Sequence, residues 1–144
     1  MILVDANIVL HAYHPHSEHH KVCRLWIDEN FSAPSPIGLP WLTICAFLRI
    51  STNPRAYEQP LTMKEAAAIA SSWFDVATVR AVVPGERYWE ILRNLLLEAQ
   101  VSGPLVTDAA LAAMALEQGA SVCTTDRDFA RFEEVQIVDP TRRT

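Results

Sequence analysis

The sequence predicts a single α/β domain, residues 1–144, built on a mainly parallel sheet of four to five strands. Short apolar or β-branched runs alternate along the chain with longer segments that have apolar residues at helical spacing. Half of the residues are hydrophobic, a fifth are charged and only four are glycine. This is the composition of a globular protein with one core, and it excludes a disordered or fibrous chain.

The first elements are a strand and two helices. Residues 1–5 are apolar up to Asp5, as expected of a strand that is buried on both faces and whose last residue emerges at its carboxyl end. A short helix is predicted over residues 7–13. Ser17 is expected to cap a second helix that runs to about Phe31.

Prolines and a capping box predict where the elements in the middle of the chain begin and end. The proline-rich residues 34–40 predict a turn around a short extended piece, and residues 41–52 predict a helix that stops before an Asn-Pro pair. A polar loop follows. Thr62 and Glu65 then form a capping box, which predicts an alanine-rich helix to about residue 74.

Strands and helices alternate again in the second half of the chain. Gly119 is placed to cap the carboxyl end of an alanine-rich helix that begins at Thr107 or Asp108. The other predicted elements are a strand over 79–83, a helix over 86–100, a strand over 121–123, a short helix over 128–132 and a strand over 135–138.

Neither a membrane span nor a secretion signal is expected. The longest apolar stretch, Ile37 to Ile50, is interrupted by Pro40 and Arg49 and is shorter than the roughly 18–20 residues of a membrane-spanning helix. The N-terminal apolar run has no basic segment before it and contains Asp5. We therefore expect a cytoplasmic protein.

Histidine and cysteine suggest a zinc site, but their spacing disfavours it. All five histidines fall within residues 11–20, and no cysteine or carboxylate beyond Glu18 is placed to complete a tetrahedron. The three cysteines are far apart, so we interpret them as buried hydrophobic side chains. The four tryptophans are likewise expected in the core or an interface. These residues are His11, His14, His16, His19, His20, Cys23, Cys45, Cys123, Trp26, Trp41, Trp73 and Trp89.

Four aspartates are placed to meet at one edge of the sheet. Asp5 closes the first strand, Asp126 and Asp128 follow the strand at 121–123, and Asp108 lies in the first turn of the helix before that strand. Two carboxylates about 4 Å apart repel by roughly 4 kcal/mol at an effective dielectric of 20, so such a cluster needs a positive partner. Mg²⁺ and Mn²⁺ prefer oxygen ligands. The cluster therefore predicts a divalent metal.

Simpler roles remain open for some of these side chains. Taken singly, Asp108 is also explained as an acid favoured at a helix start, and Asp126 as a cap for the following helix. An acid at Asp5 serves no capping need that Asn7 does not meet. Asn7 either orients Asp5 by hydrogen bonding or caps the helix that begins there.

Several short motifs along nearly the whole chain share the order and spacing of one known family. They are Leu3-Val4-Asp5-Ala6-Asn7, Phe47-Leu48-Arg49 followed by Thr52-Asn53-Pro54, Val106-Thr107-Asp108, and Thr124-Thr125-Asp126-Arg127-Asp128-Phe129. Together they resemble the PIN domain, in particular the VapC toxins of bacterial toxin–antitoxin pairs. The resemblance implies a PIN-like fold for the whole chain.

The same resemblance implies a function. It implies a Mg²⁺-dependent endoribonuclease, with Mn²⁺ as an alternative metal, that acts as the toxin of a type II pair and is blocked by a VapB-type antitoxin. A bound metal would generate the attacking hydroxide from water and neutralise charge on the phosphate. The implied metal ligands are Asp5, Asp108 and Asp126, with Asp128 as a further catalytic acid and with Asn7 and Thr124 as supporting residues.

One position departs from the family pattern. Ala46 stands where many relatives carry a glutamate. Glu117 does not replace it, because nine residues at about 100° each put Glu117 on the opposite helix face from the site acid of that helix. Asp128 is the nearest replacement, while Glu90 and Glu98, on a helix whose acids usually face solvent, stay open.

Arginines provide candidate contacts to RNA. Arg127 lies between two site acids, and Arg49 belongs to one of the family motifs, so both are predicted to contact RNA phosphates. Further candidates for phosphate contacts are Arg55, Arg93, Arg131, Arg142 and Arg143. The net charge of −5 disfavours a protein that coats nucleic acid by overall charge, and helices rich in Trp and Leu suggest a homodimer.

Two alternatives to the nuclease are kept. Loss of the glutamate at Ala46 is compatible with a catalytically silent PIN-like module that binds RNA or a protein partner. A phosphoacceptor receiver or a haloacid-dehalogenase-like phosphatase also places acids at strand ends. These families need a lysine near the phosphoryl site, whereas Lys21 and Lys64 lie in predicted helices away from the strand ends.

Overall fold

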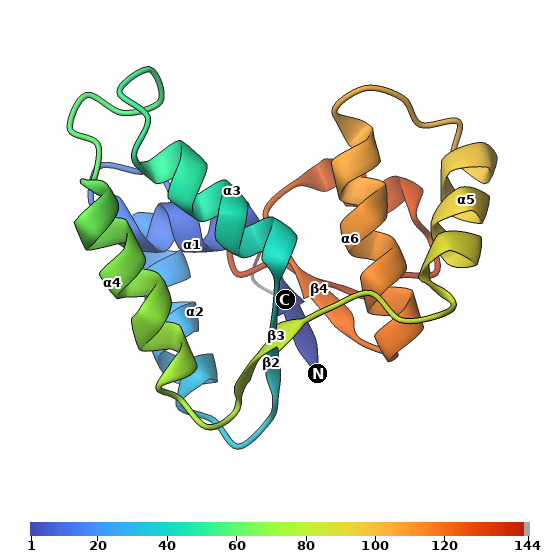
Figure 1. Cartoon of the computed structure of the whole chain (residues 1–144), viewed down its shortest axis with the longest axis horizontal. Helices are drawn as coiled ribbons and strands as arrows, with labels where there is room; N and C mark the ends of the chain where they lie inside the picture. The colour runs from blue at the N-terminus through green and yellow to red at the C-terminus, as the bar shows by residue number, and fades with distance from the viewer. Residues whose placement is uncertain (143–144) are drawn as a thin grey trace.

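Five parallel strands in the order β3-β2-β1-β4-β5 form the centre of the computed structural model, which describes residues 1–142 (Figure 1). The prediction of an α/β fold with a mainly parallel sheet is confirmed, and every pairing is parallel. The strands are β1 (Ile2–Val4), β2 (Ile37–Pro40), β3 (Val79–Val82), β4 (Ser121–Cys123) and β5 (Ile137–Val138).

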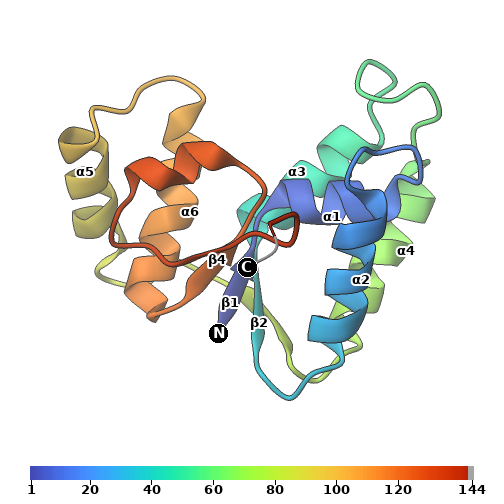
Figure 2. The ribbon, with the colours of Figure 1, turned by 180° about the vertical axis from the view of Figure 1, so that it is seen from behind.

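Helices cover both faces of the sheet, and the wholly apolar first strand explains why. Leu3 and Val4 are both fully buried, yet they belong to two different clusters of the core because neighbouring strand residues point to opposite faces. Figures 1 and 2 show the two groups of helices on either side. One face carries α1 (Ala6–Tyr13), α2 (His20–Phe31), α3 (Trp41–Ser51) and α4 (Met63–Phe74), and the other carries α5 (Tyr88–Glu98), α6 (Leu105–Gln118) and the 3₁₀ helix η1 (Arg127–Arg131).

The strand order reverses at β1. The chain adds β2 and β3 on one side of β1 and then returns to place β4 on the other. In open parallel sheets, ligands bind at such a reversal, outside the carboxyl ends of the strands. Val4 of β1 is in register with Cys123 of β4, so Asp5 and Thr124 leave the sheet side by side.

The capping residues predicted from the sequence at Thr62 and Gly119 are present in the structure. The Thr62–Glu65 capping box is present, with the Glu65 amide donating to Thr62 Oγ1 at 3.1 Å and the Thr62 amide donating to Glu65 Oε1 at 3.0 Å. Gly119 ends α6 in the left-handed conformation, at φ 64°. None of the helices described between residues 1 and 142 is long and apolar enough to cross a bilayer.

Three predicted boundaries were wrong. The second helix starts at His20 and not after Ser17, because Ser17 lies in turns in which its amide bonds to His14 O and its carbonyl accepts from the His20 amide. Helix α6 starts at Leu105, earlier than expected, since Pro104 suits a helix start. The last strand covers only Ile137–Val138.

The tryptophans, expected in the core or an interface, divide between core and surface, and one cysteine that was predicted to be buried is exposed. Trp73 is in the core, where its Nε1 donates to Tyr13 Oη at 3.1 Å. Trp41 and Trp89 are 50% and 64% exposed, so they lie outside the core. Cys45 is also exposed, unlike the other two cysteines, because its side of α3 faces a groove rather than the sheet.

Candidate functional site

A hydrogen-bonded network joins the carboxyl ends of β1 and β4. Thr124 Oγ1 donates to Asp5 Oδ2 at 2.8 Å, and Asn7 Nδ2 lies 3.0 Å from both Asp5 Oδ2 and Thr124 Oγ1. Asn7 Oδ1 accepts from the Thr125 amide at 3.2 Å. Asn7 therefore orients Asp5 and ties the two strand ends together, which is the first of the two roles predicted for it.

Asp5 has a second role that the sequence prediction missed. Its Oδ1 accepts a hydrogen bond from the Ala6 amide at 2.8 Å, which makes Asp5 itself the N-cap residue of α1. The expectation that Asn7 would meet any capping need was wrong. With one oxygen on the helix and the other on Thr124 and Asn7, the Asp5 carboxylate is held in a single orientation.

The network continues from Thr124 into η1. The Asp126 amide donates to Thr124 Oγ1 at 3.0 Å, and Asp126 Oδ1 accepts from the Asp128 amide at 2.9 Å. Asp126 is therefore the N-cap of η1, as one of its two predicted roles required. The cap fixes where Asp126 and Asp128 lie relative to β4.

Three of the four predicted acids come together. Asp108, Asp126 and Asp128 each offer a carboxylate oxygen, and these oxygens lie within 4.8 Å of one another. They come from two separate elements, the first turn of α6 and the start of η1. Asp5 lies outside this group of oxygens but is joined to it through Thr124.

Burial and mutual repulsion change the proton affinity of the site. The pKa of Asp108 rises to about 6, chiefly through burial and then through the charges of Asp126, Asp5 and Asp128. Burial is also the main cause that raises the pKa of Asp5, with Asp126 adding to it, while hydrogen bonds from Thr124, Ala6 and Asn7 oppose it. Four carboxylates gathered at one edge of the sheet, two of them with a raised pKa, form a donor set that fits a hard divalent cation.

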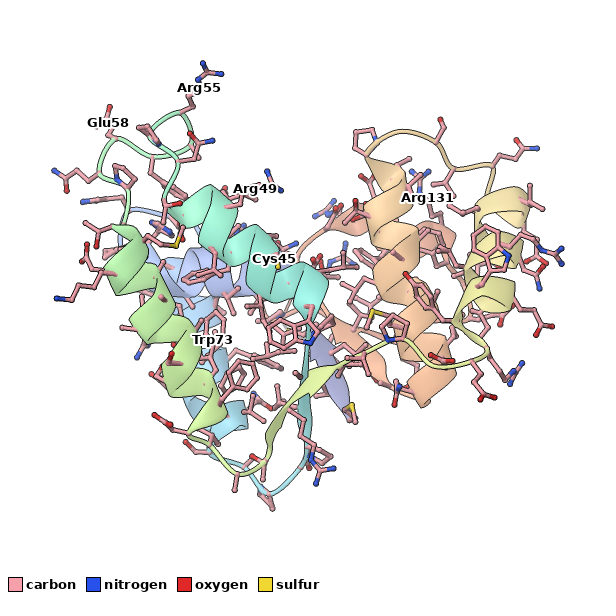
Figure 3. The ribbon with its side chains drawn as sticks, viewed as in Figure 1. Cys45, Arg49, Arg55, Glu58, Trp73 and Arg131 are labelled. Carbon is pink, nitrogen blue, oxygen red and sulfur yellow. The ribbon has the colours of Figure 1, made fainter. Side chains whose placement is uncertain are left out.

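Arg131, which the sequence offered only as one of several candidate phosphate contacts, lies beside the acids. Its Nε donates to the backbone carbonyl of Asp128 at 3.0 Å, and its Nη2 lies 3.7 Å from Asp128 Oδ1. Its charge also lowers the pKa of Asp108. Residues three apart eclipse one another in a 3₁₀ helix, so the spacing of Asp128 and Arg131 was the available signal. Figure 3 shows Arg131 beside the start of α6.

The comparison with protein families decides the identity of this fold. A family model described as "PIN domain" matches residues 2–135, a span that includes all four aspartates and the whole network around them. The chain belongs to the PIN domain family.

Close relatives of this PIN domain are VapC proteins. "Ribonuclease VapC31" of Mycobacterium tuberculosis is 38% identical over 140 residues, covering 97% of this chain and 99% of the relative. "Ribonuclease VapC37" of the same species is 36% identical over 140 residues, covering 97% of each chain. The fold prediction drawn from the motifs is thus confirmed over nearly the full length.

Solved structures show the same fold at lower identity. VapBC-1 from nontypeable Haemophilus influenzae superposes with a TM-score of 0.69 at 18% identity, over 99% of this chain and all of that one. VapC20 of Mycobacterium tuberculosis, described as a sarcin–ricin loop cleaving toxin, gives a TM-score of 0.66 at 18% identity, over 90% and 93% of the two chains. These likenesses show the PIN fold.

Ala46 faces a groove beside the acids of this PIN domain. We call this space the α3/α6 groove, a cavity of about 680 Å³ between α3 and α6. Arg49 lines it as well, one turn further along α3. The lining residues are Trp41, Leu42, Cys45, Ala46, Arg49, Val82, Pro84, Tyr88, Thr107 and Met114.

The other predicted residues lie in three different places. Arg127 lines a smaller hollow of about 310 Å³, together with Asp126 and Arg142, and Arg143 lies outside the described residues. Glu90 and Glu98 are exposed on α5, away from the group of acid oxygens.

Glu117 is a structural residue. Its two carboxylate oxygens accept hydrogen bonds from the amides of Gly85 and Arg87, at 2.7 and 2.9 Å. These bonds fasten the loop between β3 and α5 to the end of α6. The prediction that Glu117 faces away from the site acid of its own helix agrees with this arrangement.

Proposed function

We propose that this PIN domain is a divalent-metal-dependent endoribonuclease that hydrolyses RNA phosphodiester bonds. The observation that carries the proposal is the convergence of three carboxylate oxygens, from Asp108, Asp126 and Asp128, at the carboxyl edge of a parallel sheet. The names of the relatives support it, since "Ribonuclease VapC31" and "Ribonuclease VapC37" match over nearly the whole chain.

The residues present fit Mg²⁺ or Mn²⁺. Asp5, Asp108 and Asp126 would hold the ion directly or through water. Asp128 would take the place of the glutamate that many relatives carry at the position of Ala46. When bound, such an ion lowers the pKa of a water molecule and offsets charge on the phosphate. Thr124 and Asn7 hold the Asp5 carboxylate in one orientation, and Arg131 holds Asp128 against the repulsion of its neighbours.

The contacts to RNA proposed for this site come from arginine. Arg127 is exposed next to Asp126, and Arg49 lines the groove on the other side of the acids. Arginine offers a bidentate fork to phosphate oxygens. Arg131 is the cation that acts on Asp108, whereas both lysines lie on α2 and α4, so the site lacks the feature that a receiver or a dehalogenase-like phosphatase needs.

We further propose that the protein is the toxin of a type II toxin–antitoxin pair. Structures with the same fold include VapBC-1 from Haemophilus influenzae and a toxin–antitoxin complex from Klebsiella pneumoniae. A VapB-type antitoxin would bind this chain and block the acids, and the chain would itself form a homodimer. We expect the toxin to act in the cytoplasm, where RNA is the substrate.

RNA cleavage with and without chelator tests the function. Purified protein should cut RNA in Mg²⁺ or Mn²⁺, lose this activity in EDTA and lose it in Asp126→Asn. The matched control is Glu29→Gln, which removes the same charge from an exposed position on α2. Binding of RNA without any metal-dependent cutting would instead identify a catalytically silent module. In cells, growth arrest on expression should be relieved by Asp5→Asn.

A further inference from the structure

One face of α3 forms a wall of the α3/α6 groove. Trp41, Leu42, Cys45, Ala46 and Arg49 all line it, and their spacing of one, three or four residues puts them on the same side of a helix. Helices usually cover such a face with core contacts. Here Trp41 remains 50% exposed and Leu42 41% exposed.

The opposite wall of the groove includes the first turn of α6, which also carries one of the acids. Thr107 and Met114 of α6 line the groove together with Tyr88 at the start of α5. Thr107 immediately precedes Asp108, whose carboxylate belongs to the group of converging oxygens. The groove therefore reaches the first turn of α6, the turn that carries Asp108.

The chemistry of the groove suits a nucleotide. No acidic residue is among those that line the groove. At position 46, where many relatives carry a glutamate, Ala46 contributes only a methyl group. Arg49 is the one cation of the groove, and it makes no ion pair within residues 1–142. Figure 3 shows Cys45 and Arg49 along the side of α3 that faces α6. The volume of about 680 Å³ lies within the range of roughly 300–1,000 Å³ that is typical of ligand pockets.

We propose that the α3/α6 groove binds an unpaired base of the RNA substrate next to the phosphate that is cleaved at the acids. Trp41 stacks on the base, as exposed aromatic side chains do in proteins that bind single strands, and Arg49 contacts the adjoining phosphate. This inference rests on the proposed function. RNA is favoured over a protein segment as the occupant because the only charged residue that lines the groove is a cation and because the groove reaches the turn of α6 that carries Asp108.

Two exposed tryptophans provide a matched pair of variants. Trp41→Ala removes the stacking side chain in the groove, and Trp89→Ala removes an exposed tryptophan of α5 that does not line it. Binding of a fluorescent single-stranded RNA is measured by anisotropy in EDTA, which prevents metal-dependent cleavage. Trp41→Ala should weaken binding about 5- to 150-fold, the range that base–aromatic stacking supplies. Trp41→Phe should keep most of the affinity, and Trp89→Ala should bind like the unmodified protein.

A second variant and a second RNA probe distinguish the contribution of the base contact to RNA affinity from that of the phosphate contact. Arg49→Gln should weaken binding and lower the slope of log affinity against log salt by about one. An RNA duplex of the same length should bind more weakly. Its affinity should be the same for Trp41→Ala and for the unmodified protein, because its bases are paired and cannot stack on Trp41. Urea unfolding of each variant checks that the fold is intact.

The outcomes distinguish this inference from the proposed function. Equal RNA affinities of Trp41→Ala and Trp89→Ala overturn the base site, even if the unmodified protein cleaves RNA. Loss of antitoxin binding or of self-association in Trp41→Ala, with RNA affinity unchanged, also overturns it and makes the groove a protein-docking surface. Selective loss of RNA affinity in a protein that never cleaves RNA supports the base site and refutes the nuclease.

Discussion

Replacing Asp108 with asparagine should stabilise the metal-free protein at neutral pH. The pKa of Asp108 in the fold is about 6, above the ordinary value of 3.8, because burial and the charges of Asp126, Asp5 and Asp128 all disfavour its ionised form. The native state therefore binds the proton more tightly than the unfolded state does. The ionised group costs nothing below pH 3.8, costs more as the pH rises toward 6, and reaches its full cost above that.

The expected change in the free energy of unfolding follows from the change in the pKa of Asp108 on folding. The difference between 3.8 and about 6 corresponds to at most about 3 kcal/mol, at roughly 1.4 kcal/mol per pKa unit. Asp108 is only partly buried, so water screens much of the interaction and about 1 kcal/mol is the expected gain. Mg²⁺ should stabilise the unmodified protein in proportion to the logarithm of its concentration. Asp108→Asn should lose most of that response.

Urea unfolding, followed by tryptophan fluorescence, measures both effects. The gain should be present near pH 7.5 in EDTA and absent near pH 4, where the carboxyl is protonated in both states. Glu29→Gln on α2 serves as the control, since an exposed substitution away from special features changes stability by only about 0.5 kcal/mol. An equal gain at both pH values, or a full response to Mg²⁺ in Asp108→Asn, would refute the idea that repulsion among the acids shapes this site.

Three further outcomes are expected. Arg127→Ala should weaken RNA binding and flatten its salt dependence, while Mn²⁺ affinity measured by calorimetry stays unchanged; a loss of Mn²⁺ affinity would contradict the role in phosphate binding. Thr124→Val should cost roughly 1–3 kcal/mol in urea unfolding, because the Asp126 amide loses its acceptor and Asp5 loses a donor; a neutral effect would show that the network is not structural. Glu117→Ala should cost about 1 kcal/mol, because two backbone amides lose their acceptor, and should leave the response to Mg²⁺ intact.

The position of the site could be predicted from the sequence because it depends on strand ends. An apolar strand that ends in Asp5, and another that is followed by Asp126 and Asp128, must bring their last residues to one edge of a parallel sheet. The resemblance to PIN domains then indicated which acids to propose as metal ligands. Neither argument depends on knowing how the helices pack.

What could not be predicted depends on packing between distant segments. Helical periodicity shows that Trp41 and Cys45 share a face, but not that the face borders a groove instead of the core. The spacing of Asp128 and Arg131 indicates that the two side chains meet, but not that η1 brings the Arg131 charge close enough to act on Asp108 of α6. Ser17 has the chemistry of a cap, yet the turns after His14 deprive it of a helix end.

The alanine at position 46 links the acid site to the groove. Position 46 lies three residues before Arg49 on the same face of α3, so a glutamate there would be placed to pair with that arginine. Such a pair would neutralise the one cation that lines the α3/α6 groove and put a carboxylate on the path proposed for the RNA backbone. The site would gain a fourth converging acid, while the groove would lose its attraction for phosphate. With alanine, Asp128 and Arg131 supply the ordered carboxylate on the other side of the site, and Arg49 stays available for the substrate.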